Sequence, residues 1–428
     1  MRYQFINNKL FLQNRKNYTR KLKSGALAVF NANDIMPTNA DGVMPFRQNN
    51  DLFYLTGIDQ EETILVLFPE CIAPNHREIL FVKETSEHIA IWEGHKLSKK
   101  EAFEISGIKT VYWTSQFESV FDGLTSECDK LYLNSNEHSR AEKRVETRDG
   151  RFIKWCKDNY PIHLYERSAP IMQELRQIKS EGEILLMQEA CSITEKAFRR
   201  VLKFVKPGVK EYEIEAEILH EFIKNRSRGP AYGSIVASGE NACILHYTDN
   251  NMECKKGDVI LMDFGAEYAN YAADLTRSVP VSGKFSKRQK EVYNAVLRIQ
   301  KAAIKMLKVG NVMTEYNQAI GEFVTKELID LKVLSAAEVR KQDKVKPLYK
   351  NYFMHGTSHF LGLDVHDVGD RNSKFKEGMV FTCEPGLYLK QENLGIRLED
   401  DILITKKGNI NLMSSIPIDP EEIEHLMN

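Results

Sequence analysis

Residues 257–265 read GDVILMDFG, and residues 378–386 read GMVFTCEPG. Each stretch has a glycine, a run of mostly apolar residues and a carboxylate followed closely by another glycine. Short apolar runs with such boundaries are typical of buried strands. Because the unit occurs twice, the sequence predicts two halves related by a pseudo-two-fold axis, with their carboxylates meeting near that axis.

Each half also has a second acidic residue downstream, so Asp263 is followed by Asp274 and Glu384 by Glu399. A carboxylate that ends a buried strand costs several kcal/mol unless it is compensated or protonated. Four acids in one interior place would also repel one another, and multivalent cations resolve that conflict. The alternative is that these acids cap turns, since Asp beside Gly is common turn chemistry. Turn chemistry alone does not predict a matched pair of strands.

Residues 354–367 hold three of the chain's histidines, at His355, His359 and His366. The first two have the HxxxH spacing of a zinc-protease helix, but Gly356 stands where the general-base glutamate would be. Gly356 and Gly362 also disfavour a continuous helix. The zinc-protease helix is therefore a weak interpretation.

A histidine precedes the repeated carboxylate at a similar distance in both halves. His246 lies 17 residues before Asp263, and His366 lies 18 residues before Glu384. A single histidine is more often a surface or satisfied core residue than a ligand. Histidines beside an acidic repeat favour ligation, and the mixed oxygen and nitrogen donors suit a pair of divalent manganese, cobalt, iron or zinc ions.

The first 170 or so residues differ from the rest. Short β-like runs at residues 64–68 and 78–82 alternate with helical and polar stretches, which predicts a mixed α/β domain. A domain boundary is expected near residues 168–170, where Pro170 interrupts the pattern.

Two long helices are expected beyond that boundary. Ser180 with Glu183, and Ser286 with Gln289, have the capping-box spacing. The first helix should run to residues 207–208, where Pro-Gly stops it, and the second to about residue 310.

Composition excludes several classes of protein. A chain of 428 residues is too long for one ordinary core, and its 59 basic residues nearly balance its 60 acidic ones. We therefore expect neither nucleic acid nor membrane partners. The sequence has no signal-peptide pattern and no apolar run of membrane-spanning length. The seven cysteines include no CxxC pair and are expected to be free thiols, so the predicted compartment is the cytoplasm.

Several segments together carry a resemblance to a known family. Five lie in the C-terminal part: ILHY at 244–247, the stretch from MDFG at 262–265 to ADLTR at 273–277, HGTSHFLGLDVHD at 355–367, EPGLY at 384–388 and GIRLEDD at 395–401. Two lie in the N-terminal part, FRQNNDLFYLTG at 46–57 and IWEG at 91–94. In this order the segments resemble the pita-bread metallopeptidases, and within them the Xaa-Pro aminopeptidases (aminopeptidase P).

The resemblance implies an α/β (α+β) protein of two domains. Residues 1–172 would form a smaller, mixed α/β aminopeptidase P-type domain. Residues 173–428 would form the catalytic pita-bread domain with its pseudo-two-fold repeat.

The resemblance also implies the metal ligands and the metals. Asp274 and Glu399 would bridge two divalent ions, Asp263 would bind one of them, and His359 and Glu384 would bind the other. Mn²⁺ is favoured, with Co²⁺, Zn²⁺ or Fe²⁺ as alternatives.

The remaining site residues follow from the same resemblance. Glu384 would also move the proton from the attacking water to the leaving nitrogen. The other catalytic or substrate-facing positions would be His246, His355, His366, Tyr388 and Arg397. Trp92 is expected to wall the proline pocket, although a plain core or surface tryptophan is an equal alternative.

The function implied is hydrolysis of the N-terminal Xaa-Pro bond of peptides by a homo-oligomer, a dimer or a tetramer. A prolidase-type dipeptidase would share the fold and all five ligands. Methionine aminopeptidase would share the ligands but has no domain comparable to residues 1–170. A non-catalytic peptide-binding protein of the same fold is the alternative from another class, against which the intact ligand set argues.

Overall fold

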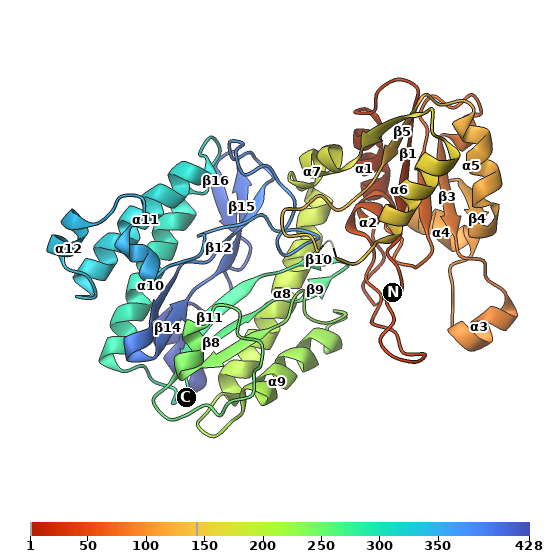
Figure 1. Ribbon diagram of the computed structural model, residues 1–428. Coiled ribbons are helices and arrows are strands. Elements are labelled where there is room, and N and C mark those ends of the chain that lie inside the picture. The colour runs from red at the N-terminus through yellow and green to blue at the C-terminus, as the bar shows by residue number, and fades with distance from the viewer. Residues whose placement is uncertain (1, 143) are drawn as a thin grey trace. The chain divides into compact units, whose positions relative to one another are not determined.

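The computed structural model describes residues 2–142 and 144–428, and these form two compact units. The units comprise residues 3–175 and 176–428 (Figure 1). The division falls three residues after the predicted end of the first domain at 172. Ala169 and Pro170 begin helix α7 (Ala169–Arg176).

The N-terminal unit is built on one mixed sheet with the strand order β4-β3-β2-β1-β5-β6. Its strands are β1 (Ala26–Asn31), β2 (Ile64–Leu67), β3 (Glu78–Val82), β4 (Thr110–Trp113), β5 (Lys130–Leu133) and β6 (Leu164–Arg167). The two strands predicted at 64–68 and 78–82 are confirmed as β2 and β3. β1 pairs antiparallel with β2 and parallel with β5.

Helices cover both faces of this sheet. Phe121 and Cys156, from α5 (Phe117–Thr125) and α6 (Arg148–Asn159), belong to one apolar core with Leu27 and Val29 of β1. On the other face, Tyr18 of α1 stacks edge-on against Phe30 of β1. The remaining helices of the unit are α1 (Lys9–Thr19), α2 (Asn50–Thr56), α3 (Glu87–Glu93) and α4 (Lys99–Ser106), with short 3-10 turns η1 (Pro74–His76) and η2 (Thr114–Gln116).

The C-terminal unit repeats one order of elements, two long helices followed by a small antiparallel sheet. In the first half, α8 (Glu181–Phe204) and α9 (Glu211–Lys224) lie side by side and the sheet order is β11-β8-β7. In the second half, α10 (Lys287–Met306) and α11 (Met313–Asp330) lie side by side and the sheet order is β12-β15-β16 (Figure 1). The predicted repeat and the α/β pita-bread class are confirmed.

The strands of these sheets are short. They are β7 (Ile235–Ser238), β8 (Val259–Phe264), β11 (Leu275–Pro280), β12 (Val380–Cys383), β15 (Asp400–Thr405) and β16 (Gly408–Asn411). Two further hairpins join β9 (Glu267–Tyr268) to β10 (Tyr271–Ala272) and β13 (Gly386–Leu389) to β14 (Leu394–Arg397). The other elements are α12 (Ala336–Lys341), α13 (Pro420–Met427) and the turns η3 (Gly239–Cys243), η4 (Leu348–Asn351) and η5 (Lys390–Glu392).

The helix starts predicted from sequence are confirmed, and the predicted helix ends are wrong by a few residues. Ser180 and Ser286 each accept a hydrogen bond from the backbone of the third helical residue and complete a capping box. However, α8 ends at Phe204 and α10 ends at Met306. Pro207 disfavours the α region at Lys206, the residue before it. The backbone is already extended one residue earlier, at Val205 (φ −61°, ψ 122°).

All seven cysteines are buried free thiols, as predicted. Among the described residues, no helix combines the length and the apolar character that crossing a bilayer requires.

Candidate metal centre

Strand pairing brings the carboxylates of the two halves together. Within the sheet of the first half, Thr276 of β11 lies opposite Asp263 of β8. On its other side Thr276 forms an isolated bridge with Glu399, whose backbone N–H donates to the Thr276 carbonyl over 3.0 Å. Three neighbouring backbone segments therefore present an acid, a hydroxyl and an acid in a row. The Thr276 hydroxyl donates to Glu399 Oε2 over 2.6 Å.

Close packing of the hairpin between the two acids of the first half requires Gly265. A Cβ at this position would lie 1.7 Å from the Ala273 carbonyl oxygen, which is far inside van der Waals contact. The glycine thus lets the chain return immediately and place Asp274 next to Asp263. Close packing of the hairpin thus explains the second glycine of the repeated unit in the first half.

All five predicted ligands lie in one group. Ligand atoms of Asp274, His359 and Glu399 lie within 4.8 Å of one another. His359 Nε2 is 3.5 Å from Asp274 Oδ2 and 3.7 Å from Glu384 Oε1. Asp263 joins the group through a shared tyrosine that the sequence analysis did not single out.

That tyrosine is Tyr232, in the segment before β7. Its hydroxyl lies 2.6 Å from Asp263 Oδ1 and 2.5 Å from Asp274 Oδ1. A phenol has one proton to donate and so can satisfy only one of two carboxylates at a time. Burial and the neighbouring acids Asp263 and Asp274 hold the pKa of Tyr232 well above its usual value, so it remains a donor.

The acids are strongly perturbed by their shared burial. Burial raises the pKa of Glu384 to about 7, with Asp274 and Asp263 adding to the rise and His359 and Arg397 opposing it. Burial, together with Asp274 and Glu384, also holds the pKa of Glu399 well above its usual value. For Asp263, burial again raises the pKa, and Arg397 is the largest opposing influence. Nearby positive charge would reverse these shifts.

His359 is oriented as a metal ligand would be. Its Nδ1 lies 2.9 Å from the Phe360 carbonyl, which can only accept, so Nδ1 carries the proton. Nε2 faces the carboxylates of Asp274 and Glu384. Burial lowers the pKa of His359, but these two carboxylates raise it above its usual value, so a metal ion bound here would take the place of a proton. A ligating histidine commonly has this arrangement, in which the outer ring nitrogen donates to a backbone carbonyl. Four carboxylates with one imidazole fit a divalent transition metal.

Arg397, predicted to orient the carboxylates, contacts them directly and through Thr276. It donates from Nη2 to Asp263 Oδ2 over 2.5 Å and from Nε to the Thr276 hydroxyl over 3.1 Å. It also donates from Nη1 to the Tyr388 hydroxyl over 2.9 Å. One guanidinium against four carboxylates leaves the group net negative.

His355 and Tyr388 extend this chain of hydrogen bonds. His355 Nε2 lies 2.8 Å from the Tyr388 hydroxyl, and its Nδ1 lies 2.8 Å from the Gly356 carbonyl. Burial lowers the pKa of His355 to about 3, and Arg397, then Lys350 and last His246 lower it further. The ring is therefore neutral at physiological pH, with the proton on Nδ1. No helix forms at residues 355–359 in this part of the described chain, as the glycines predicted.

The other predicted residues lie at differing distances from this group. The His366 ring centroid is 4.4 Å from that of His359. His246 is exposed, in the loop after η3, and acts electrostatically on His355. Trp92 belongs to the N-terminal unit, on α3, and is 79% exposed. Its role remains a prediction.

Two residues of the group, Tyr232 and Thr276, were missed from the sequence. Thr276 follows Asp274 by two positions at the start of a strand, and strand alternation could have placed both on one face. Tyr232 has no such signal, because it enters the group from a loop more than 30 residues away from Asp263.

Comparisons with known proteins show which family the chain resembles over its length. Residues 185–406 match metallopeptidase family M24, and residues 11–132 match the aminopeptidase P N-terminal domain. The chain is 36% identical to the Xaa-Pro aminopeptidase of Escherichia coli K12, with 99% of this chain and 98% of that protein covered. It is 35% identical to the Xaa-Pro aminopeptidase of Haemophilus influenzae, covering 91% and 90%.

Solved structures show the same likeness. Zinc-substituted aminopeptidase P of E. coli, in complex with product, superposes with a TM-score of 0.88 at 33% identity and covers 99% of each chain. The similarity therefore extends over both units and includes every element that carries a carboxylate of the group.

Proposed function

Since the chain belongs to metallopeptidase family M24, we propose that it is a metal-dependent aminopeptidase that removes the first residue from peptides with proline in second position. The observation that carries the proposal is the group formed by Asp263, Asp274, His359, Glu384 and Glu399, described above. The full-length similarity to proteins named Xaa-Pro aminopeptidase supports the choice of substrate.

We assign two divalent cations to this group, with Mn²⁺ favoured over Co²⁺, Zn²⁺ or Fe²⁺. Asp274 and Glu399 would be shared by both ions, Asp263 would bind one, and His359 and Glu384 the other. When bound, such a pair lowers the pKa of a water molecule held between the ions and so supplies hydroxide at neutral pH.

Glu384 is the residue we propose to move the proton. A carboxylate beside the attacking water can accept its proton, and Glu384 Oε1 lies within the ligand group, 3.7 Å from His359 Nε2. Its side chain is 20% exposed, so a substrate can reach it. Glu384 would accept the proton of the attacking water and donate it to the leaving proline nitrogen, which has no proton of its own in the peptide.

Tyr388 and His366 are the proposed hydrogen-bond partners of the tetrahedral intermediate. Arg397 donates to the Tyr388 oxygen, and the neutral His355 offers Nε2 as acceptor, so the phenol proton points at His355 when no substrate is bound. Arg397 and His355 thus set the direction in which Tyr388 can donate. Arg397 also holds Asp263 in place.

His246 is the proposed donor to the oxyanion that forms on the first residue's carbonyl. Its ring is exposed on the loop that follows η3, and it lies close enough to His355 to lower the pKa of that ring. A preorganised donor at a developing oxyanion typically contributes about 10²–10³ in rate. Trp92 would contact the proline ring, whose fixed φ and missing N–H distinguish it from other residues.

The test compares three synthetic peptides with the same first residue: an Xaa-Pro-Yaa tripeptide, the Xaa-Pro dipeptide and an Xaa-Ala-Yaa tripeptide. The protein is stripped with a chelator and reloaded with Mn²⁺. We expect metal-dependent release of the first residue from the prolyl tripeptide and none from the alanyl one. Cleavage of the dipeptide alone would assign a dipeptidase, and no cleavage by the loaded protein would indicate a binding protein.

We also expect a homo-oligomer, a dimer or a tetramer. Light scattering on the full chain after size-exclusion chromatography measures this directly.

A further inference from the structure

We infer that Glu211, at the first position of α9, is a positioning residue for His246. The inference rests on the proposed role of His246 in the reaction. Glu211 itself is fully buried and would not touch the substrate, so it would act through the loop that presents the histidine.

The Glu211 carboxylate accepts four hydrogen bonds, all from the segment 238–252. Oε1 accepts from the Ser238 backbone N–H and from the Ser238 hydroxyl, both over 2.7 Å. Oε2 accepts from the Tyr247 hydroxyl over 2.8 Å and from the Met252 N–H over 2.9 Å. One side chain therefore binds the beginning, the middle and the end of the segment that contains His246.

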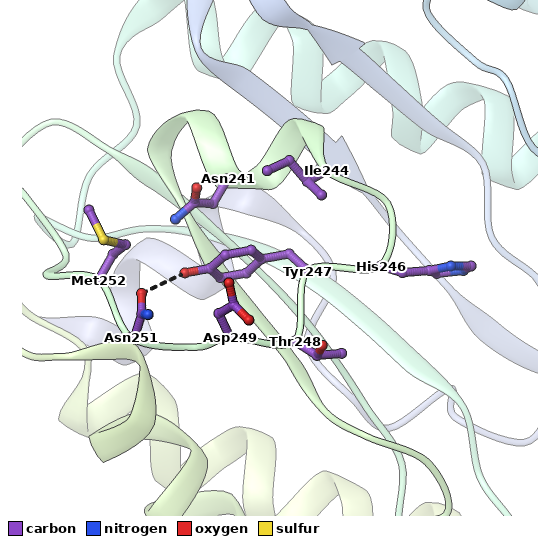
Figure 2. A pocket seen from close by; sticks show the side chains of 8 residues that line it. All are labelled: Asn241, Ile244, His246, Tyr247, Thr248, Asp249, Asn251 and Met252. Atoms are coloured by element: carbon purple, nitrogen blue, oxygen red, sulfur yellow. Dashed lines mark hydrogen bonds between the residues drawn. The ribbon is translucent and has the colours of Figure 1, made fainter.

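The middle anchor is the neighbour of His246. Figure 2 shows the side chains of His246 and Tyr247 pointing in opposite directions from the loop. Tyr247 is buried and reaches back to Glu211, whereas His246 projects outward. The backbone turns at residues 245–246, and the two side chains leave it on opposite sides (Figure 2). An anchor on the Tyr247 ring therefore holds the backbone from which His246 projects.

Apolar packing also holds the loop, since Ala242, Cys243 and Tyr247 belong to a buried apolar cluster against which Leu245 packs. The loop lines an open cavity of about 380 Å³ with its own side chains (Figure 2). Across residues 245–249 of the described chain, Tyr247 is the residue whose side chain hydrogen-bonds to another element. The hydrogen bond from Tyr247 to Glu211 adds direction to this apolar packing, because a hydrogen bond fixes where the ring hydroxyl lies. Asn250 supplies a further anchor at the far end, where it bonds to Ser234 and Val236.

A simpler explanation is that Glu211 only stabilises the start of α9, where a negative charge suits the helix dipole. Glu213 shares that advantage in the same turn of the helix and accepts the Lys210 N–H over 2.7 Å. Glu213 is exposed and none of its hydrogen bonds goes to the loop. Glu213→Gln is therefore the matched control, since it removes the helix-terminal charge alone.

The variant Glu211→Gln keeps the size of the side chain and removes part of its accepting capacity. The amide oxygen can still accept from Ser238, but the NH₂ group then faces the Met252 N–H, and two donors cannot pair. If the amide is rotated by 180°, its NH₂ group faces the Ser238 N–H instead, and again two donors face each other. In either orientation one backbone anchor of the loop is lost.

The experiment is a double-mutant cycle on the metal-loaded full chain, with kcat/KM measured on the prolyl tripeptide. His246→Ala alone should lower kcat/KM by about 10²-fold. Glu211→Gln should lower it by about tenfold or more when His246 is present, since small misplacements are costly. In the His246→Ala background it should change kcat/KM by less than twofold. Glu213→Gln should leave kcat/KM unchanged.

The same factor for Glu211→Gln in both backgrounds would overturn the inference, because a general structural defect does not depend on His246. An unchanged kcat/KM for His246→Ala would also overturn the inference. Cleavage of the tripeptide by the wild-type protein would in that case still support the proposed activity, so the two failures can be distinguished. Hydrogen exchange gives a readout without catalysis: Glu211→Gln should speed exchange at Ser238 or Met252, and unchanged exchange at both would contradict the inference.

A milder variant keeps the test decisive should Glu211→Gln fail to fold. Tyr247→Phe removes one of the four donors and leaves the Glu211 charge in place. It should show the same dependence on His246 in the cycle, with a smaller fold-change. Equal effects with and without His246 would again count against a positioning role.

Discussion

Asp149 in the N-terminal unit and Asp274 in the C-terminal unit are buried to a similar extent, 7% and 5% exposed. Asp149 is held by neutral amides, with Asn31 Nδ2 donating to Oδ1 over 2.9 Å. Burial raises its pKa to about 7. Asp274 instead lies among further carboxylates, a tyrosine and Nε2 of His359. Burial of an acid therefore does not by itself indicate a metal site. The groups that surround the acid determine whether it can bind a metal ion.

A third buried acid is compensated by the positive charges of two neighbouring side chains. Asp367, beside His366, accepts from Arg176 over 2.6 Å and from Lys179 over 3.0 Å. Burial alone would raise its pKa, but Lys179 and Arg176 outweigh burial and lower it. Protonation, ion pairing and metal binding are thus three solutions to one desolvation cost, and mutation should separate them.

The largest effect is expected for Asp274→Asn. If Asp274 is shared by two metal ions, the variant should lose bound metal, and kcat on the prolyl tripeptide should fall by about 10³-fold or more. Metal analysis of the dialysed protein together with the peptide assay measures both. Full metal content with substantial activity would make Asp274 equivalent to Asp149, a buried acid without a cation, and would sink the shared-ligand assignment.

The next effect in size is the loss of stability in Asp367→Asn. Removing the negative charge leaves Lys179 buried without its counter-charge and leaves Arg176 with only the half-exposed Asp364, which costs about 3 kcal/mol or more. Chemical denaturation followed by circular dichroism measures the change in the free energy of unfolding. Asp364→Asn is the matched control, since Asp364 pairs with the same Arg176 over 2.8 Å but its side chain is 48% exposed. It should cost less than about 1 kcal/mol.

Asp149→Asn should do the opposite and stabilise the N-terminal unit. An acid with a pKa of about 3.9 in the unfolded chain and about 7 in the folded one binds its proton more tightly when folded. Wild-type stability should therefore fall as pH rises from about 4 to about 7, with the full penalty above pH 7. The variant escapes that penalty, so its gain should be near zero at pH 4, should grow as the pH rises and should reach its full size above pH 7.

Paired denaturation curves at pH 4 and pH 8 measure this gain. A gain that does not depend on pH would mean that the carboxyl of Asp149 does not titrate in this range. A loss of stability at pH 8 would mean that the charged form is the one the amides of the N-terminal unit favour.

The smallest effect is expected for an acid that is not buried. Glu392 accepts two hydrogen bonds from Arg288, over 2.8 and 2.7 Å, with the two side chains 34% and 36% exposed. Glu392→Gln should change the free energy of unfolding by less than about 1 kcal/mol, and less still at high salt. If Glu392→Gln destabilised the protein as much as Asp367→Asn, burial would not be what determines the size of these effects.

Much of the fold could be read from local patterns. The capping boxes at Ser180 and Ser286 are contained within four residues each, and the repeated strands show as glycine-bounded apolar runs, so both were predicted. The ends of α8 and α10 were not, because no single residue sets a helix end when the last turn competes with the packing around it. The five proposed metal ligands could be picked out because each stands in a recognisable motif.

The residues that hold the site in place could not be predicted in this way. Thr276 meets Glu399 across 123 positions of sequence, Tyr232 joins Asp263 to Asp274, and Glu211 binds three points of the His246 loop. Their residue types are common, and their importance comes from the partner that the fold brings to them. Asp149 and Asp274 look equally acidic in the sequence, and only their neighbours in space distinguish them.

The sequence by itself determined the elements, the repeat and the identity of the acids, because these depend on residue type and local spacing. Which acids share one place, which nitrogen of His359 faces them and which loops are tied to which helices were decided by the tertiary structure. The physical reason is that desolvation and hydrogen bonding act between atoms in contact, and contacts between distant residues exist only after the strands of both halves have paired.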